Sequence, residues 1–159
     1  MVVGALALFF GQHAVRTVEA GLAAMLLGVT QVDAPRALGT NVLVPLRGAR
    51  IALDITASCS AALMASPFFL LAGGLLLSRR TSVGSAVKTL GVMALWLFAM
   101  NQLRILLVVL SMRIWGFERG YELSHIAFGS VISTLAVLGG VLLFVRAIAH
   151  GQPVSELRV

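Results

Sequence analysis

Charged residues are scarce in this chain. Asp, Glu, Lys and Arg together make up 11% of its 159 residues, whereas hydrophobic residues make up 59%. Such a composition is too apolar for a soluble domain of this size. Several apolar runs approach or exceed the ~20 residues that a helix needs to cross a bilayer. The composition therefore excludes an ordinary soluble protein and predicts an all-α integral membrane protein with a single transmembrane domain over residues 1–150.

Cysteine is nearly absent, because Cys59 is the only one. A single cysteine excludes an intrachain disulfide. Together with three histidines that stand far apart in the sequence, it provides no spacing typical of a metal site. We therefore expect no metal and no other cofactor.

Acidic residues are half as numerous as basic ones, which gives a formal net charge of +6. The basic residues lie at the ends of apolar runs and have no aromatic residues between them, a pattern that disfavours nucleic-acid binding. Flanking anchors for membrane helices explain them better. The expected partner of these side chains is membrane lipid, with no nucleic acid.

The apolar runs predict about four transmembrane helices, at residues 2–29, 59–77, 84–114 and 125–148, followed by a polar tail at 151–159. The start of the chain lacks the basic region and the cleavage site of a signal peptide. Residues 2–29 are simplest as one long, tilted helix on which Arg16 and Glu19, one turn apart, can pair. The alternative is two short helices broken near Gly11.

The stretch 30–58 is the longest without helical character and contains two segments typical of strands, 42–44 and 51–55. Residues 45–49 can turn between them. This predicts a small β-hairpin that lies over one membrane face. Pro45 has no N–H to donate, and we expect it to confine its strand to an edge.

Two further features interrupt the helices. Pro67 stands inside the second one and should kink it or leave a carbonyl without its helical partner. Residues 115–124 are polar enough to be a loop between the third and fourth helices.

Three reactive side chains are expected at one depth. Cys59, Arg104 and His125 each lie about 16 to 21 residues from basic residues at the other end of their helix, roughly 24–30 Å at 1.5 Å per residue. Those basic residues are Arg79, Arg80, Lys88 and Arg146. Arginines are nearly as numerous on the Cys59 side, so charge alone leaves open which face is outside.

A thiol, an imidazole and a guanidinium at one depth suit acyl transfer. Cys59 is expected at a helix N-terminus, with Ser58 as N-cap, where the helix dipole favours a thiolate. His125 can activate the thiol and protonate a leaving amine, and Arg104 can stabilise an oxyanion. Each residue also has a simpler interpretation. Cys59 can be a small apolar side chain, His125 an anchor at the membrane interface where a helix starts, and Arg104 an arginine whose charged end extends to that interface.

Three motifs now resemble those of a known family. Ser58-Cys59-Ser60, Asn101-Gln102-Leu103-Arg104-Ile105 and Ser124-His125 with Gly129 are similar to the motifs of the exosortase/archaeosortase family, in the same order on three consecutive helices. The resemblance covers roughly residues 28–144. It implies a membrane cysteine transpeptidase or protease whose site faces the extracytoplasmic side of the prokaryotic cell membrane.

The resemblance also implies roles and a substrate. Cys59 would be the nucleophile, Arg104 the oxyanion or substrate binder and His125 the acid/base, with Ser60, Asn101 and Gly129 binding substrate or supporting the site. Family substrates are secreted proteins with a C-terminal sorting signal, made of a short motif, a transmembrane helix and a basic cluster. The rival hypothesis is a non-enzymatic membrane scaffold or small permease subunit, in which Asn101 and Arg104 only hold helices together.

Overall fold

The computed structural model describes residues 2–30, 34–46, 48–77, 82–124, 126 and 129–151. Along these residues the elements are α1 (Val2–Val29), β1 (Arg36–Leu38), β2 (Asn41–Leu46), β3 (Ala49–Asp54), the short 3-10 helix η1 (Ala57–Cys59), α2 (Ala61–Leu77), α3 (Val83–Trp115), α4 (Phe117–Leu123) and α5 (Gly129–Gly151). His125, the Arg79-Arg80 pair and the predicted tail from residue 152 onward lie outside the described residues.

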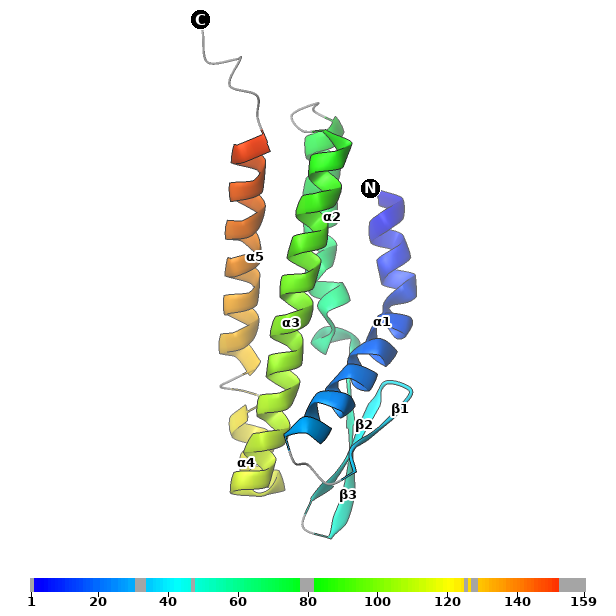
Figure 1. Cartoon of the computed structure of the whole chain (residues 1–159), viewed down its shortest axis with the longest axis vertical. Helices are drawn as coiled ribbons and strands as arrows, with labels where there is room; N and C mark the ends of the chain where they lie inside the picture. The colour runs from blue at the N-terminus through cyan, green and yellow to red at the C-terminus, as the bar shows by residue number, and fades with distance from the viewer. Residues whose placement is uncertain are drawn as a thin grey trace, which may run out of the picture.

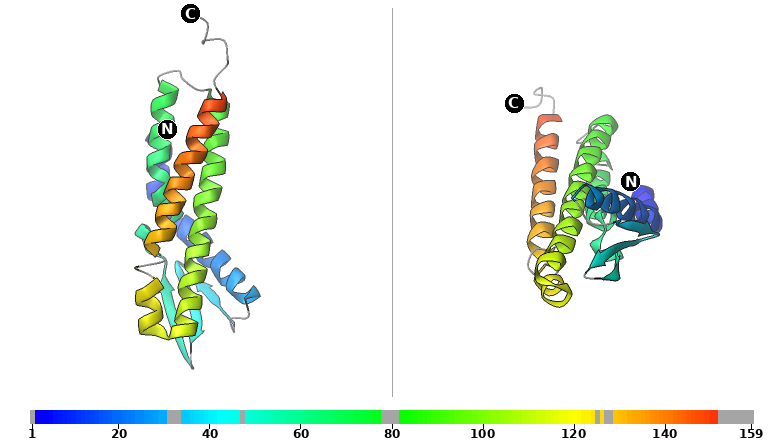
Figure 2. Two further views of the ribbon diagram at one scale, coloured as in Figure 1. Left: turned by 90° about the vertical axis from the view of Figure 1, so that its left-hand side faces the viewer. Right: turned by 60° about the horizontal axis from the view of Figure 1, so that its bottom comes forward.

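The helices α2, α3 and α5 run side by side, and the three-stranded sheet lies with α4 at one end of them (Figure 1). A view turned by 90° shows the same bundle with the sheet and α4 at one end (Figure 2), and α3 packs against both α2 and α5. The last part of α1 passes obliquely beside the sheet (Figure 1), and α1 packs against α2, α3, β1 and β2. The molecule is therefore a helical bundle with a small sheet at one end.

Two of the described helices are long and apolar enough to cross a membrane. They are α3, with 33 residues and an 18-residue stretch of mean hydropathy 1.9, and Gly129–Ala147 of α5, with a similar stretch of mean hydropathy 2.0. Only 33% and 22% of the residues in these two stretches are buried inside the protein, so most of them are at least partly exposed. A core helix of a soluble protein is mostly buried, and the outward apolar faces instead suit contact with lipid. The helix α2 is also apolar but has only 17 residues.

The expected strands are both present, and a third strand joins them. The sheet is antiparallel in the order β1-β2-β3, and its turns place Gly39 and Gly48 at positive φ, which glycine adopts without strain. Pro45 therefore lies on the central strand, and the expectation that it marks an edge strand is wrong. The central strand tolerates it because β1 begins at Arg36, opposite Leu43, so no residue of β1 pairs with Pro45.

Of the two alternatives for the first helix, the structure has the single one, α1, which is unbroken from Val2 to Val29. Arg16 and Glu19 are on this helix but turn to partners elsewhere in the chain. Arg16 Nη1 donates to the main-chain oxygen of Ile55 at 3.3 Å. Glu19 accepts from the start of α2 and from α3, as described below.

In α2, nearby side chains bond to the main-chain groups that lack helical partners at the start of the helix and at the proline. Ser60 caps the helix, because its Oγ accepts from the main-chain N–H of Ala62 at 3.3 Å. Ser58 lies within η1, so the expectation that it would cap α2 is wrong. Pro67 lies inside the helix as expected, and the carbonyl of Leu63, four residues earlier, accepts instead from the Ser66 hydroxyl at 2.8 Å.

The predicted loop at 115–124 is mostly a short helix, α4. Gly116, with φ of 87°, separates it from α3 and lets the chain turn back. A Cβ at Gly120 would lie 2.5 Å from the Cα of Met112, so only glycine permits this close approach of α4 to α3. The loop prediction failed because seven residues are too few to show the helical repeat of apolar positions in the sequence. Close packing against α3 stabilises α4 instead.

Two apolar clusters fill the interior, one on each half of α3. One joins α1, the sheet and the second half of α3, around Val109 and Met112. The other joins α2, α5 and the first half of α3, around Met93 and Leu97. Buried polar residues occupy the level between the clusters: Glu19, Ser60, Asn101 and Gln102.

The contact between α3 and α5 gives a first prediction. A Cβ at Gly139 would lie 2.8 Å from the Trp96 ring, and Trp96 Nε1 donates to the Ala136 oxygen at 3.0 Å, which holds the ring in place. We expect Gly139→Ala to destabilise the fold by about 1–3 kcal/mol through overpacking. Gly91→Ala is the matched control, because a Cβ there meets no atom within 4 Å of the described structure. Thermal unfolding of the detergent-solubilised proteins should show a lower midpoint for Gly139→Ala only, and equal midpoints would contradict this packing.

Candidate functional site

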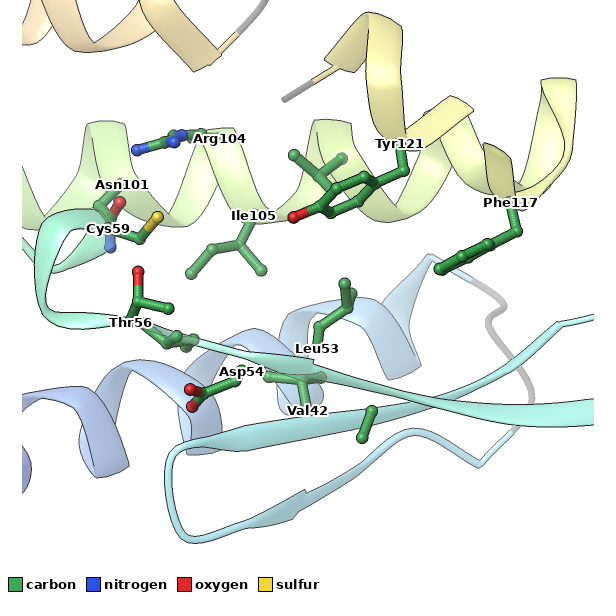
Figure 3. Close-up of a pocket in the computed structure, with 13 residues that line it drawn as sticks. Val42, Leu53, Asp54, Thr56, Cys59, Asn101, Arg104, Ile105, Phe117 and Tyr121 are labelled. Carbon is green, nitrogen blue, oxygen red and sulfur yellow. The ribbon is translucent and has the colours of Figure 1, made fainter. Parts of the chain in front are cut away.

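A cavity of about 430 Å³ lies between the sheet, η1, α3 and α4. Its lining is mostly apolar. The polar side chains in it are Asp54, Thr56, Cys59, Asn101, Arg104 and Tyr121. Cys59, Asn101 and Arg104 lie together at one end of the cavity, and Thr56 points toward them from the end of the sheet (Figure 3).

Cys59 is the last residue of η1, two residues before α2 begins. Its main-chain N–H donates to the Thr56 oxygen at 3.0 Å, and the next N–H, of Ser60, donates to the Ala57 oxygen at 3.2 Å. These bonds fix a tight turn between β3 and α2. The turn leaves the thiol half-buried in the wall of the cavity.

Arg104 is on α3, one turn after Asn101, and packs against the start of α5. A Cβ at Gly129 would lie 3.2 Å from both Nε and Nη2 of the guanidinium, so the absence of a side chain there makes room for it. Nη1 donates to the Ser133 hydroxyl at 3.5 Å. The guanidinium is turned toward the Cys59 end of the cavity (Figure 3).

The two polar atoms of the Asn101 side chain differ in their hydrogen bonding. It is 2% exposed, and its Nδ2 donates to Glu19 Oε1 at 3.0 Å. Its Oδ1 is buried and has no hydrogen-bond partner among the described residues. The side chain lies beside Cys59 in the cavity wall (Figure 3). Buried amide oxygens normally have a hydrogen-bond partner, so this one is an exception within the described residues.

Glu19 supports these residues from behind. It is completely buried, and the same Oε1 accepts from the main-chain N–H of Ala61 at 2.9 Å. Ser60 also hydrogen-bonds to this carboxylate. A third tie comes from Gln102, whose Nε2 donates to the Glu19 main-chain oxygen at 3.3 Å. The Glu19 carboxylate thus joins Ala61, the first residue of α2, to Asn101, which is one turn before Arg104 on α3.

The structure brings together most of the candidate site residues. Cys59, Asn101 and Arg104 line one cavity, and Gly129 contacts Arg104. Ser60 does not line the cavity; it is fully buried and caps α2. His125 lies outside the described residues.

Sequence reasoning missed Glu19 and Tyr121 as parts of the site. An acidic residue inside an apolar helix is a signal for Glu19, because such residues usually pair across helices. Tyr121 lines the cavity from α4 and stacks on Phe117, with ring centroids 6.0 Å apart. No pattern in the sequence indicated that α4 would face the sheet.

The arrangement offers a nucleophile, a cation and a hydrogen-bond acceptor around one space. The Cys59 sulfur can form a thioester with an acyl group, and Arg104 can stabilise the oxyanion that precedes it. In the part of the chain that is described, no three His, Cys, Asp or Glu side chains are grouped to hold a metal ion. Comparisons with protein-family models, curated proteins and solved structures found no match to this chain.

The Glu19 contacts give a second prediction. Glu19→Ala leaves the Ala61 N–H and the Asn101 amide without their buried acceptor, which costs about 1–3 kcal/mol of stability. Glu19→Gln keeps one oxygen and should destabilise less. Glu122→Ala, at an exposed position of α4, should change stability by less than about 0.5 kcal/mol. Thermal midpoints in detergent measure the three variants, and a Glu19→Ala midpoint equal to that of Glu122→Ala would exclude this supporting role.

Proposed function

We propose that the protein is a membrane-embedded cysteine transpeptidase or protease of the exosortase/archaeosortase type. The observation that carries the proposal is that Cys59 and Arg104, 45 positions apart in the sequence, line the same end of one cavity. Its substrate would be a secreted protein with a C-terminal sorting signal. The order of the three sequence motifs supports the same assignment.

The proposed reaction is acyl transfer. The Cys59 thiolate attacks the carbonyl carbon of the scissile peptide bond, and Arg104 stabilises the oxyanion of the tetrahedral intermediate. The carbon–nitrogen bond then breaks, the leaving amine takes from His125 the proton that His125 removed from the Cys59 thiol, and a thioester to Cys59 remains. Water or an amine then attacks the thioester, His125 takes its proton, and the carbon–sulfur bond breaks to release the thiolate. In the sequence, His125 is four residues before Gly129, the residue that contacts Arg104.

The proposal places four helices, α1, α2, α3 and α5, across the cytoplasmic membrane. The cavity and the sheet would then be at the extracytoplasmic face, with both termini in the cytoplasm. The outward apolar faces of α3 and α5 support this placement, as do Cys59 and Arg104 at a common level of the bundle. A sorting signal anchored by its own transmembrane helix would meet the cavity at the membrane edge.

One observation favours part of the rival scaffold hypothesis. Asn101 and Gln102 both bond to Glu19, so these two amides do hold α3 to α1. Arg104, through its bond to Ser133, can likewise hold α3 to α5. The same hypothesis gives no role to a half-buried thiol in the wall of the cavity that Arg104 also lines. Reactivity of Cys59 separates the two functions, because a purely structural thiol would be inert.

Catalysis gives a third prediction, measured as processing of a co-expressed protein that bears the C-terminal signal. Cys59→Ala and Cys59→Ser should both abolish processing, because a hydroxyl ionises far less readily than a thiol. Arg104→Ala and His125→Ala should each lower the rate on the order of 10²-fold or more. Arg104→Lys should recover little, since an ammonium cannot reproduce the planar guanidinium.

Arg146→Lys, on an exposed position of α5 outside the cavity, is the matched control and should process normally. Each variant's abundance in the membrane is compared by immunoblot. Processing by Cys59→Ala at normal abundance would overturn the enzyme assignment and leave the scaffold hypothesis.

Topology gives a fourth prediction, made in a Cys59→Ala background that has no other cysteine. A membrane-impermeant maleimide applied to intact cells should label Arg36→Cys and Glu122→Cys, which are exposed near the cavity end. It should not label Val83→Cys, which is 66% exposed at the start of α3, at the other end. All three should react after permeabilisation. Labelling of Val83→Cys alone in intact cells would invert the proposed orientation.

A further inference from the structure

Among the described strands, β3 pairs only with β2, so one side of it is an open edge. The main-chain N–H of Ile55 donates to the Thr40 oxygen at 3.0 Å, which fixes the phase of hydrogen bonding between the two strands. Antiparallel pairs alternate between bonded and non-bonded positions. Two residues earlier, Leu53 is therefore bonded to Val42, its partner in the register.

The residues between these bonded positions turn their main-chain groups the other way. Ala52 and Asp54 direct N–H and C=O away from β2, toward the open edge. The position of Pro45 agrees with this phase. It pairs with Arg50 at a non-bonded position, where a missing N–H breaks no bond to β3.

This open edge borders the cavity. Ala52, Leu53 and Asp54 line one side of it, and Ile105 and Tyr121 line the side opposite, from α3 and α4. The close-up shows β3 passing between the cavity and β2 (Figure 3). The Asp54 carboxylate accepts from the Thr40 hydroxyl at 2.8 Å, so it is held on the sheet and leaves the main-chain groups to face the cavity.

Resting on the proposed function, we propose that the open edge of β3 binds the substrate's main chain as a fourth strand and leads it to Cys59. An extended peptide is the ligand that offers donors and acceptors at the two-residue spacing of Ala52 and Asp54. Its alternate side chains enter the apolar part of the cavity.

The arrangement also sets the direction of the bound chain. Cys59 follows β3 by five residues, and the tip of the β2–β3 hairpin lies at the far end of the molecule (Figure 1). The substrate's sorting motif precedes its transmembrane helix, so the chain enters from the hairpin tip and passes Cys59 before it reaches the membrane. It therefore runs parallel to β3, and the residues before the scissile bond are the ones that pair.

The test uses alkylation of Cys59, the only cysteine, in the full-length protein in detergent. The probes are acetyl-Val-Ala-Val-Ala-chloromethyl ketone and acetyl-Ala-chloromethyl ketone. In both, the thiolate attacks the chloromethyl carbon, a carbon–sulfur bond forms, chloride leaves, and the thiol proton passes to the buffer. Intact mass gives both rates, and their ratio is the length advantage. We expect a length advantage on the order of tenfold, as one or two added main-chain hydrogen bonds provide.

Ala52→Pro removes the outward N–H and should reduce the length advantage to near one. Ala37→Pro is the matched control: it lies on the opposite edge of the same sheet, outside the cavity, at a position where β1 is not bonded to β2. Its length advantage should equal that of the unmodified protein. A second measurement needs no variant: N-methylation of alternate residues of the tetrapeptide should abolish the advantage, and N-methylation of the residues between them should not.

The outcomes separate this inference from the proposed function. A length advantage that survives both Ala52→Pro and every N-methylation means that the cavity holds side chains or acyl chains, and overturns the strand. Equal rates for the two probes at a rapidly alkylated Cys59 also overturn it, and leave the cysteine chemistry standing. A Cys59 inert to both probes removes the enzyme assignment and the strand with it. The strand is supported if N-methylation removes the length advantage at alternate residues only, and if Ala52→Pro removes it while Ala37→Pro does not.

Discussion

The structure depends on one buried carboxylate. Glu19 Oε1 accepts from the first N–H of α2 and from the Asn101 amide of α3, with no water-exposed surface of its own. A buried acidic group is tolerated only where donors surround it, so its two bonds fix how α1, α2 and α3 meet. Cys59 stands two residues before one donor, and Arg104 stands one turn after the other. The distance between the Cys59 thiol and the Arg104 guanidinium therefore depends on a third residue, Glu19, that bonds to neither.

This polar level also explains where the cavity lies. On one side of it, α2, α3 and α5 pack an apolar core without strands, and on the other side α1 and the sheet pack against the second half of α3. The chain changes from sheet to helix at η1, between the two cores. Arg16, one turn before Glu19, holds the carbonyl of Ile55, the residue after β3, to α1. Because α4 folds back along α3 through Gly120, it closes the side that the sheet leaves open.

Local patterns in the sequence predicted the long helices, both strands of the hairpin and the common level of Cys59 and Arg104. What they missed depends on contacts distant in sequence. Glu19 was matched with Arg16, its neighbour on the helix, whereas its partners are about 40 and 80 residues away. Ser58 and Ser60 are equally good caps by composition, and only the turn of η1 makes Ser60 the cap. Pro45 indicated an edge because sequence cannot show that β1 stops short of it.

An open strand edge at a membrane constrains where this sheet can be. Unpaired N–H and C=O groups are not tolerated in hydrocarbon, so the edge of β3 must meet water or another main chain. The strand is followed within five residues by the thiol and then by the apolar helix α2. Under the proposed function, the cavity would therefore lie where water ends and lipid begins. A peptide bond just outside a transmembrane helix lies at this same boundary, with its extended side in water and its helical side in lipid. The sheet edge suits the first half of such a chain, and the outward apolar faces of α3 and α5 suit the second.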